Sequence, residues 1–206
     1  MSRPHAVLIA GGKGERLGGV RKADLRIGGR RLVDRVVEAL GAVSAPLMIA
    51  TGPGGNWPHL PAGALAVPDL DAPVGGPLAG LAAAVEALQA TGIAEGLLVS
   101  IAVDTPFLPT DFVAVMRDRL GSAPAAYAAY GGQFYPPNAI WRIEALATLP
   151  HQVRTGKAPH SLKALQQMAG AVPVDWVTRA ASDPFANVNT LADLLALARM
   201  NARGAA

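Results

Sequence analysis

Short apolar runs alternate with stretches of helical periodicity along this chain. Residues 6–10 are continuously apolar and are followed by two glycines, a pattern typical of a strand buried on both faces of a parallel sheet. From Leu32 to Val43 the apolar positions recur with helical spacing, and Leu47 to Ala50 form a second short apolar run. The opening of the chain therefore predicts a strand, a loop, a helix and a strand.

The same alternation continues to the other end of the chain. Glycines over 75–80 precede a helical pattern that reaches Leu88, and residues 96–103 form the strongest buried-strand pattern, which stops at Asp104. Strands that alternate with helices in this way predict a three-layer, Rossmann-like α/β domain with a mainly parallel central sheet. The further elements that we expect are a helix capped by Thr110, strands at 125–130 and 138–141, a helix over 162–168, a strand near 172–177, and a helix opened by Thr190 with Asp193 completing a capping box.

The composition narrows the class of protein. The chain has 206 residues with no internal repeat and no linker, so we expect one domain over 1–206. It is 51% hydrophobic, but no run approaches the ~18 uninterrupted apolar residues of a membrane helix, so we expect no membrane partner. The chain has no cysteine, which excludes disulfides and thiolate metal sites and fits a reducing compartment, and no secretion signal follows Met1. We therefore expect a cytoplasmic protein.

The basic residues are unevenly distributed. The net charge of +3 is too small to argue for nucleic acid as a partner, but eight of the eighteen lysines and arginines lie between residues 13 and 35. Such a cluster predicts a site for a polyanion, and the alternative is a solvated basic face. The eight residues are Lys13, Arg16, Arg21, Lys22, Arg26, Arg30, Arg31 and Arg35.

A glycine-rich segment over residues 9–22 coincides with this basic cluster and follows the first expected strand. Five glycines within nine residues allow the backbone to approach a ligand closely, so that successive amides can converge on phosphate oxygens. The carboxyl end of a strand in an open α/β sheet is also where ligands bind. We interpret the segment as a phosphate-binding loop, with a plain glycine-rich connection as the alternative.

Two widespread phosphate motifs do not fit the sequence. The dinucleotide fingerprint needs Gly-x-Gly-x-x-Gly, whereas the spacing from Gly14 to Gly18 is one residue too long. The P-loop needs Ser or Thr after Gly-Lys, but Ala158 follows Gly156 and Lys157. A redox Rossmann module and P-loop kinase or ATPase chemistry are therefore disfavoured.

Several polar residues are candidates for the chemistry. Asp104 ends a buried strand and suits Mg²⁺, which takes one or two carboxylates together with substrate phosphates; the alternative is a carboxylate that caps the next turn. Asp69 follows another expected strand, and near it Asp71 fits a solvated loop. Asn187 and Asn189 are spaced to point the same way from an extended segment, with a turn and a helix start as the alternative.

Five motifs together resemble the molybdenum cofactor guanylyltransferase family. Their order and spacing match over nearly the whole chain, and the last of them narrows the choice among nucleotidyltransferases. The motifs are Leu8-Ile9-Ala10-Gly11-Gly12, Gly18-Gly19-Val20-Arg21-Lys22, Gly76-Pro77-Leu78-Ala79-Gly80, Asp104-Thr105-Pro106-Phe107-Leu108-Pro109 and Phe185-Ala186-Asn187-Val188-Asn189-Thr190.

The resemblance implies transfer of GMP from MgGTP to the terminal phosphate of molybdopterin, with release of pyrophosphate. Residues 1–105 would then form the nucleotide-binding part and residues 106–206 the acceptor-binding part. We also expect a monomer that makes at most transient contact with other cofactor-biosynthesis proteins. The implied site residues are Ile9, Ala10, Gly11, Gly12, Lys22, Asp69 and Asp104 for the nucleotide, Asp104 also for Mg²⁺, and Asn187 and Asn189 for the acceptor. Our own hypothesis adds that Arg16 and Lys22 stabilise the charge of the triphosphate.

The chain departs from the family pattern at three places. The chain reads Ala50-Thr51-Gly52-Pro53 where the family often has an Asn after its second strand, Arg21 where an Asp is common, and Tyr135-Pro136-Pro137 where a His-Pro pair is often found. Two alternatives therefore stay open. One is a related transferase, for cytidylyl transfer to molybdopterin or nucleotidyl transfer to a sugar phosphate. The other is a nucleotide-binding regulatory protein without turnover.

Overall fold

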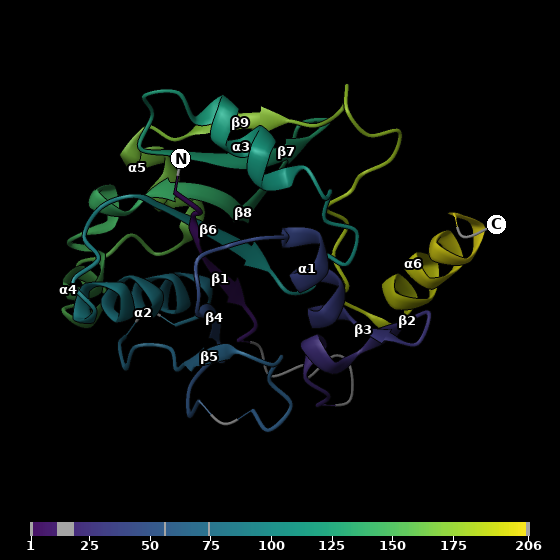
Figure 1. The fold of residues 1–206 in the computed structure, drawn as a ribbon, viewed down its shortest axis with the longest axis horizontal. Helices are drawn as coiled ribbons and strands as arrows, with labels where there is room; N and C mark the ends of the chain where they lie inside the picture. Colours follow the sequence, from purple (N-terminus) through teal and green to yellow (C-terminus); the bar gives the residue numbers. More distant parts are fainter. Residues whose placement is uncertain (1, 12–18, 56, 74, 205–206) are drawn as a thin grey trace.

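A seven-stranded sheet forms the centre of the molecule (Figure 1). The computed structural model describes residues 2–11, 19–55, 57–73 and 75–204. In these residues the strand order is β5-β4-β1-β6-β8-β7-β9. The strands are β1 (His5–Ile9), β4 (Leu47–Ala50), β5 (Ala64–Val67), β6 (Leu97–Ala102), β7 (Ala125–Tyr130), β8 (Gln133–Arg142) and β9 (Val172–Asp175).

The sheet is mainly parallel, which confirms the predicted fold class. Strands β5, β4, β1 and β6 pair in parallel, and β8 then pairs antiparallel with both β6 and β7. Because β9 pairs parallel with β7, β8 is the single reversed strand among the seven described. A separate hairpin of β2 (Arg26–Ile27) and β3 (Arg30–Arg31) follows the glycine-rich segment.

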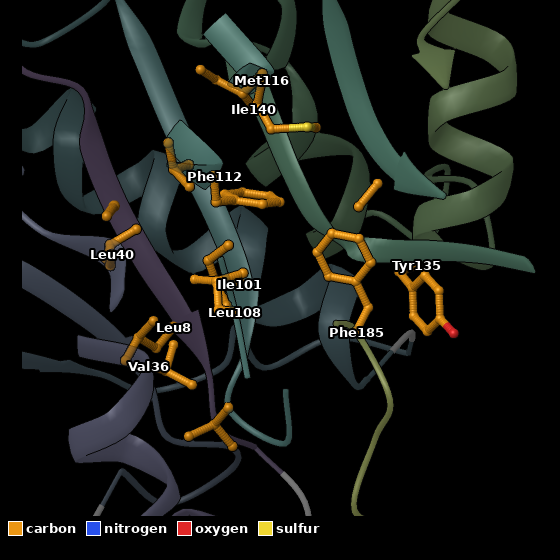
Figure 2. Packing of buried hydrophobic residues seen from close by; sticks show 14 of the residues in the cluster. Leu8, Val36, Leu40, Ile101, Leu108, Phe112, Met116, Tyr135, Ile140 and Phe185 are labelled. Carbon is orange, nitrogen blue, oxygen red and sulfur yellow. The ribbon is translucent and has the colours of Figure 1, made fainter. Parts of the chain in front are cut away.

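Helices cover both faces of this sheet and complete three layers. Successive residues of β1 alternate between two cores, with Leu8 in one and Val7 in the other, which explains why every residue from 6 to 10 is apolar. The first core holds α1 (Leu32–Leu40) and α3 (Phe112–Leu120), and Figure 2 shows Leu8, Val36 and Phe112 gathered in it. The second core holds α2 (Pro77–Ala90), α4 (Leu149–Arg154) and α5 (Leu162–Ala169).

Helix α2 packs unusually close to the sheet. A Cβ atom at Gly80 would lie 2.8 Å from the Ala50 Cβ, so a glycine is needed where this helix crosses β4. The residues from Leu78 to Val85 are all buried, because the helix is covered by the sheet on one side and by α4 on the other. The start of α2 is thereby fixed beside the carboxyl ends of β1 and β4.

The C-terminal helix α6 (Leu191–Gly204) lies to the side of the sheet, next to the β2–β3 hairpin (Figure 1). It is attached through a small third core that contains Leu197, Val188 and Ile27. The predicted capping box at its start is confirmed, since the Asp193 N–H donates to Thr190 Oγ1 at 3.2 Å and the Thr190 N–H donates to Asp193 Oδ2 at 2.8 Å. Among the described residues, no helix has the length and apolar content needed to cross a membrane.

Some expected element boundaries are wrong. Thr110 does not cap α3, because the Phe112 N–H donates to the Pro109 carbonyl in a turn and the helix begins only at Phe112. Strand β8 begins at Gln133, five residues before the expected start at Asn138, since a hairpin joins it directly to β7. The short β2–β3 hairpin and helix α4 are additions to the predicted elements, because short elements of this kind carry little periodicity.

Candidate active site

A pocket of about 230 Å³ opens at the carboxyl ends of β1 and β6. From β1 the chain crosses through α1 to β4 on one side, and α2 later returns it to β6 on the other side. The site therefore occupies the point where the strand order reverses, which is where open α/β sheets bind ligands. Its lining residues are Ile9, Ala10, Gly11, Lys22, Pro77, Ala102, Val103, Asp104, Pro137 and Asn187.

Gly11 forms the floor of this pocket where the chain leaves β1. A Cβ atom at this position would lie 3.0 Å from the Gly52 Cα and 3.1 Å from the Gly52 nitrogen. Because both neighbours are backbone atoms, a side chain here would displace the loop that follows β4. The rest of the predicted phosphate loop, including Gly12 and Arg16, lies outside the described residues.

Three predicted site residues meet at one point. The Lys22 Nζ donates to Asp104 Oδ2 at 2.8 Å and to Asn189 Oδ1 at 2.8 Å. The Lys22 and Asp104 side chains are 24% and 15% exposed, so the ion pair is largely shielded but can be reached from solvent. A cation that follows the first strand and a carboxylate that ends the central strand thus face the same pocket.

The backbone around Asp104 is fixed from two sides. The Val103 N–H donates to the Ile9 carbonyl at 3.1 Å, and the Val188 N–H donates to the Asp104 carbonyl at 3.1 Å. These bonds place the end of β6 between β1 and the segment that carries Asn187 and Asn189. The carboxylate therefore has a defined direction toward the pocket.

The groups at this point suit a hard cation. Mg²⁺ prefers oxygen donors, and the Asp104 carboxylate and the amide oxygen of Asn189 both lie at the Lys22 ammonium, with Asn187 in the same pocket. No group of three or more His, Asp or Glu side chains that could bind a metal occurs among the described residues. An ion bound at Asp104 would therefore take further oxygens from water or from a ligand, as Mg²⁺ does when it binds with nucleotide phosphates.

Asp69 lies behind Gly11, after the end of β5. Its Oδ1 is buried and has no hydrogen-bond partner within the described residues, and it lies 3.3 Å from the place of a Cβ at Gly80. Burial raises the pKa of the Asp69 carboxyl, and a hydrogen bond from the Gly52 backbone opposes the rise. A buried acceptor without a protein partner is suited to a donor group of a ligand. Asp71, in contrast, is exposed, in agreement with a solvated loop.

Much of the basic cluster has a structural role. The Arg21 Nη1 donates to the Thr51 carbonyl at 3.0 Å, and its guanidinium lies 5.2 Å from the Trp57 ring, so it connects the start of the short helix at Lys22–Asp24 to the end of β4. Arg31 pairs with Asp34 through two hydrogen bonds. Part of the charge that the sequence pattern assigns to a polyanion is therefore neutralised within the protein.

Two residues of β8 support the surroundings of Asp104 and of the segment that carries Asn187 and Asn189; Tyr135 stands at a departure from the family pattern, whereas the sequence pattern does not single out Asn138. Asn138 is 1% exposed, and its Nδ2 donates to Thr105 Oγ1 at 3.2 Å beside Asp104. The Tyr135 hydroxyl donates to the carboxylate of Asp183, at the start of the segment that carries the two asparagines. The only signal for Asn138 in the sequence is a polar residue within an apolar strand.

Comparison with known proteins gives a consistent result. A family model described as "MobA-like NTP transferase domain" matches residues 6–169. A molybdenum cofactor guanylyltransferase from Acidiphilium cryptum is 36% identical over 94% of this chain and 93% of its own length. A protein of the same name from Rhodobacter capsulatus is 36% identical over 93% of each chain.

Solved structures share the fold at lower identity. The molybdopterin-guanine dinucleotide biosynthesis protein A from Archaeoglobus fulgidus superposes with a TM-score of 0.70 at 18% identity, covering 97% of this chain and 99% of that one. The 2-C-methyl-D-erythritol 4-phosphate cytidylyltransferase from Thermus thermophilus superposes with a TM-score of 0.65 at 20% identity, covering 98% and 99%. At these identities the likeness shows a common fold and nothing further.

Proposed function

Because the chain belongs to the molybdenum cofactor guanylyltransferase family, we propose that it transfers GMP from GTP to the terminal phosphate of molybdenum-bound molybdopterin. The products are pyrophosphate and the guanine dinucleotide form of the cofactor. The observation that carries this proposal is that Lys22, which lines the pocket together with Gly11, binds both Asp104 and Asn189.

Residues 1–105 supply the nucleotide side in this proposal. Ile9, Ala10, Gly11 and Gly12 contact the nucleotide in this proposal, and Asp69 accepts a hydrogen bond from it. Lys22 and Arg16 neutralise the triphosphate. Support comes from the absence of any side chain at Gly11 and from the buried Asp69 oxygen, which has no partner among the described residues.

The reaction that we propose needs no general base. An oxygen of the acceptor phosphate forms a bond to the α-phosphorus of GTP, while the bond from that phosphorus to the β-phosphate oxygen breaks in line. The acceptor phosphate is ionised at neutral pH and is already a nucleophile, so positioning and charge neutralisation supply the catalysis. In this proposal Lys22 stabilises negative charge as it moves toward the departing pyrophosphate, and its position beside Asp104 supports that role.

Asp104 is the residue that would hold Mg²⁺, with its remaining ligands from the triphosphate. A bound ion would supply positive charge that offsets the negative charge of the reacting phosphates. Asn187 and Asn189 belong to residues 106–206, which we assign to the acceptor. Their amides are suited to orient its terminal phosphate, and Lys22 joins the two sides because it contacts both Asp104 and Asn189.

Pyrophosphate release tests the proposal directly. The purified protein is given each of the four nucleoside triphosphates with Mg²⁺ and molybdenum-bound molybdopterin, and release is expected with GTP. Release with CTP would show that the transferred nucleotide is CMP. Release with a sugar phosphate in place of the pterin would show that the acceptor is a sugar phosphate. No release with any pair, together with nucleotide binding by calorimetry, would favour a regulatory protein.

The setting of the reaction is part of the proposal. We assign it to the cytoplasm, in agreement with a chain that has no cysteine, and to a monomer that meets other cofactor-biosynthesis proteins only transiently. Gel filtration with light scattering tests the monomer. A stable dimer at micromolar concentration would contradict it.

A further inference from the structure

Strand β8 carries a bulge beside the pocket. Tyr127 of β7 pairs with Ala139, but the next residue, Ala128, pairs with Tyr135, so residues 136–138 of β8 have no partners in β7. Bulges of this kind redirect side chains and are frequent next to active sites. Here the bulge places Pro137 in the pocket wall and turns Asn138 toward the end of β6.

Asn138 connects the bulge to the two residues that frame the site. Its Oδ1 accepts a hydrogen bond from the Ala102 N–H at 2.8 Å, and its Nδ2 donates to Thr105 Oγ1 at 3.2 Å. The Thr105 hydroxyl in turn donates to Asn187 Oδ1 at 3.5 Å. Asn138 and Thr105 are 1% and 0% exposed, so water does not compete for the two hydrogen bonds of Asn138.

Tyr135 makes a second connection on the other side of the bulge. Its hydroxyl donates to Asp183 Oδ2, while Asp183 Oδ1 accepts a hydrogen bond from the Phe185 N–H at 2.9 Å. The Phe185 ring is fully buried and lies 5.3 Å from the Tyr135 ring. Burial, and then the hydrogen bond to Asp183, raise the pKa of Tyr135, so the hydroxyl stays protonated and continues to donate at physiological pH.

Both connections act on the segment 183–189. Its first residues are fixed by Tyr135, and its asparagines are reached through Thr105 and through the Lys22 bond to Asn189. Neither Tyr135 nor Asn138 lines the pocket itself. Their influence on a ligand therefore has to pass through the segment.

We propose that Tyr135 and Asn138 are positioning residues for the acceptor, which hold segment 183–189 in the place where Asn187 and Asn189 meet the acceptor phosphate. The inference rests on the proposed function for the identity of the acceptor. The link from the bulge to the segment rests only on contacts between described residues. The nucleotide side is fixed separately, by Gly11 and its neighbours.

Two single-hydroxyl deletions test this role in turnover. Tyr135→Phe and Thr105→Val are each expected to raise the KM for molybdenum-bound molybdopterin about tenfold, with the KM for GTP unchanged. Tyr135→Phe removes the hydrogen bond to Asp183, and Thr105→Val removes the one to Asn187 together with the one from Asn138. Tyr127→Phe is the matched control, since Tyr127 lies on the neighbouring strand and its ring packs on Phe134 instead. An equal rise in both KM values would indicate general loosening of the fold and would overturn the proposal.

Hydrogen–deuterium exchange provides a readout that does not depend on turnover. In the ligand-free protein, amides of 183–189 are expected to exchange about tenfold faster in Tyr135→Phe than in the wild type or in Tyr127→Phe. Unchanged exchange would overturn the link from Tyr135 to the segment. Faster exchange in a protein that shows no turnover with any triphosphate would leave that link intact and count against the proposed function. Faster exchange with an unchanged acceptor KM would overturn the role in acceptor binding.

Discussion

The two sides of the pocket are built in different ways. On the side of β1, β4 and β5 the elements approach closely, since a Cβ atom at Gly11 would lie 3.0 Å from the Gly52 Cα and one at Gly80 would lie 2.8 Å from the Ala50 Cβ. On the side of β8, side chains form the contacts, through the Tyr135–Asp183 pair and the Asn138–Thr105 hydrogen bond. Sterics shape the first side, and directed hydrogen bonds between distant residues shape the second.

This difference bears on how the sides can change. A backbone-lined surface presents the same amides whatever the neighbouring side chains are, so it suits a triphosphate that is common to many reactions. A surface held by side chains can be altered by single substitutions, so it suits the part of the reaction that differs between relatives. The family match over residues 6–169 covers the first side completely and ends before segment 183–189.

Asp104 lies at the junction of the two sides, and its loss should have the largest effect. Asp104→Ala is expected to lower kcat on the order of 10³-fold, because it removes a preorganised charge at the reacting phosphates. Pyrophosphate release at saturating Mg²⁺ measures the effect. Asp118→Ala is the control, since the Asp118 side chain is 81% exposed and should leave turnover unchanged. Near-normal turnover of Asp104→Ala would remove Asp104 from the reaction.

A single added methyl group should damage the backbone-built side selectively. Gly11→Ala is expected to weaken GTP binding at least about tenfold and to lower the free energy of unfolding by about 1–3 kcal/mol, because the new Cβ meets the Gly52 backbone at 3.0 Å. Calorimetry and urea denaturation measure the two effects. Gly75→Ala is the matched control, since a Cβ there has no neighbour within 4 Å among the described residues. Tight GTP binding by Gly11→Ala would contradict a sterically defined nucleotide side.

Measurements on Asp69→Asn show whether the Asp69 carboxylate serves ligand binding or the stability of the fold. Its raised pKa means that the folded state disfavours the charged form, so the wild type loses stability as the pH rises through the folded pKa. Asp69→Asn should therefore raise the free energy of unfolding at pH 7 by up to about 1 kcal/mol, because a partly buried charge is removed whose Oδ1 has no hydrogen-bond partner among the described residues. The gain should vanish below the ordinary carboxyl pKa of 3.8, where the wild-type carboxyl is protonated in both states.

The same variant should bind GTP more weakly. A gain in stability with a loss of affinity is expected where a protein retains an unsatisfied group for its ligand. Urea denaturation across the pH range and calorimetry with GTP give the two quantities. A variant that is less stable than the wild type at pH 7 would show that the Asp69 carboxylate serves the fold.

The two sides differ in how far they can be predicted from the sequence, for a physical reason. Apolar runs locate β1 and β6, and the carboxyl ends of neighbouring parallel strands meet at one edge, so local patterns alone lead to the expectation that Lys22 and Asp104 share a pocket. Their 2.8 Å contact agrees with that expectation. The roles of both residues in the reaction stay a prediction.

The side held by hydrogen bonds leaves almost no trace in the sequence. Asn138 and its partner Thr105 are 33 residues apart, and their contact depends on a bulge that no periodicity reveals. Charge alone likewise assigns Arg21 to a ligand, although its guanidinium also connects the loop to the Thr51 carbonyl. Pairings between distant polar side chains follow from the finished packing, which local patterns do not encode.

The smallest expected effect concerns the junction between Asn189 and α6. Thr190→Ala should lower the free energy of unfolding by about 1 kcal/mol, because its hydroxyl accepts the Asp193 N–H at the helix start. Ser161→Ala is the matched control, since Ser161 accepts the Ala164 N–H at the start of α5, whose residues do not line the pocket. Both variants should lose similar stability in urea denaturation.

Only Thr190→Ala should also raise the acceptor KM, by about twofold, because Asp193 Oδ2 also accepts the Asn189 N–H and loses part of its support. If neither variant changed the acceptor KM, the side of the pocket that is held by side-chain hydrogen bonds would end before Thr190.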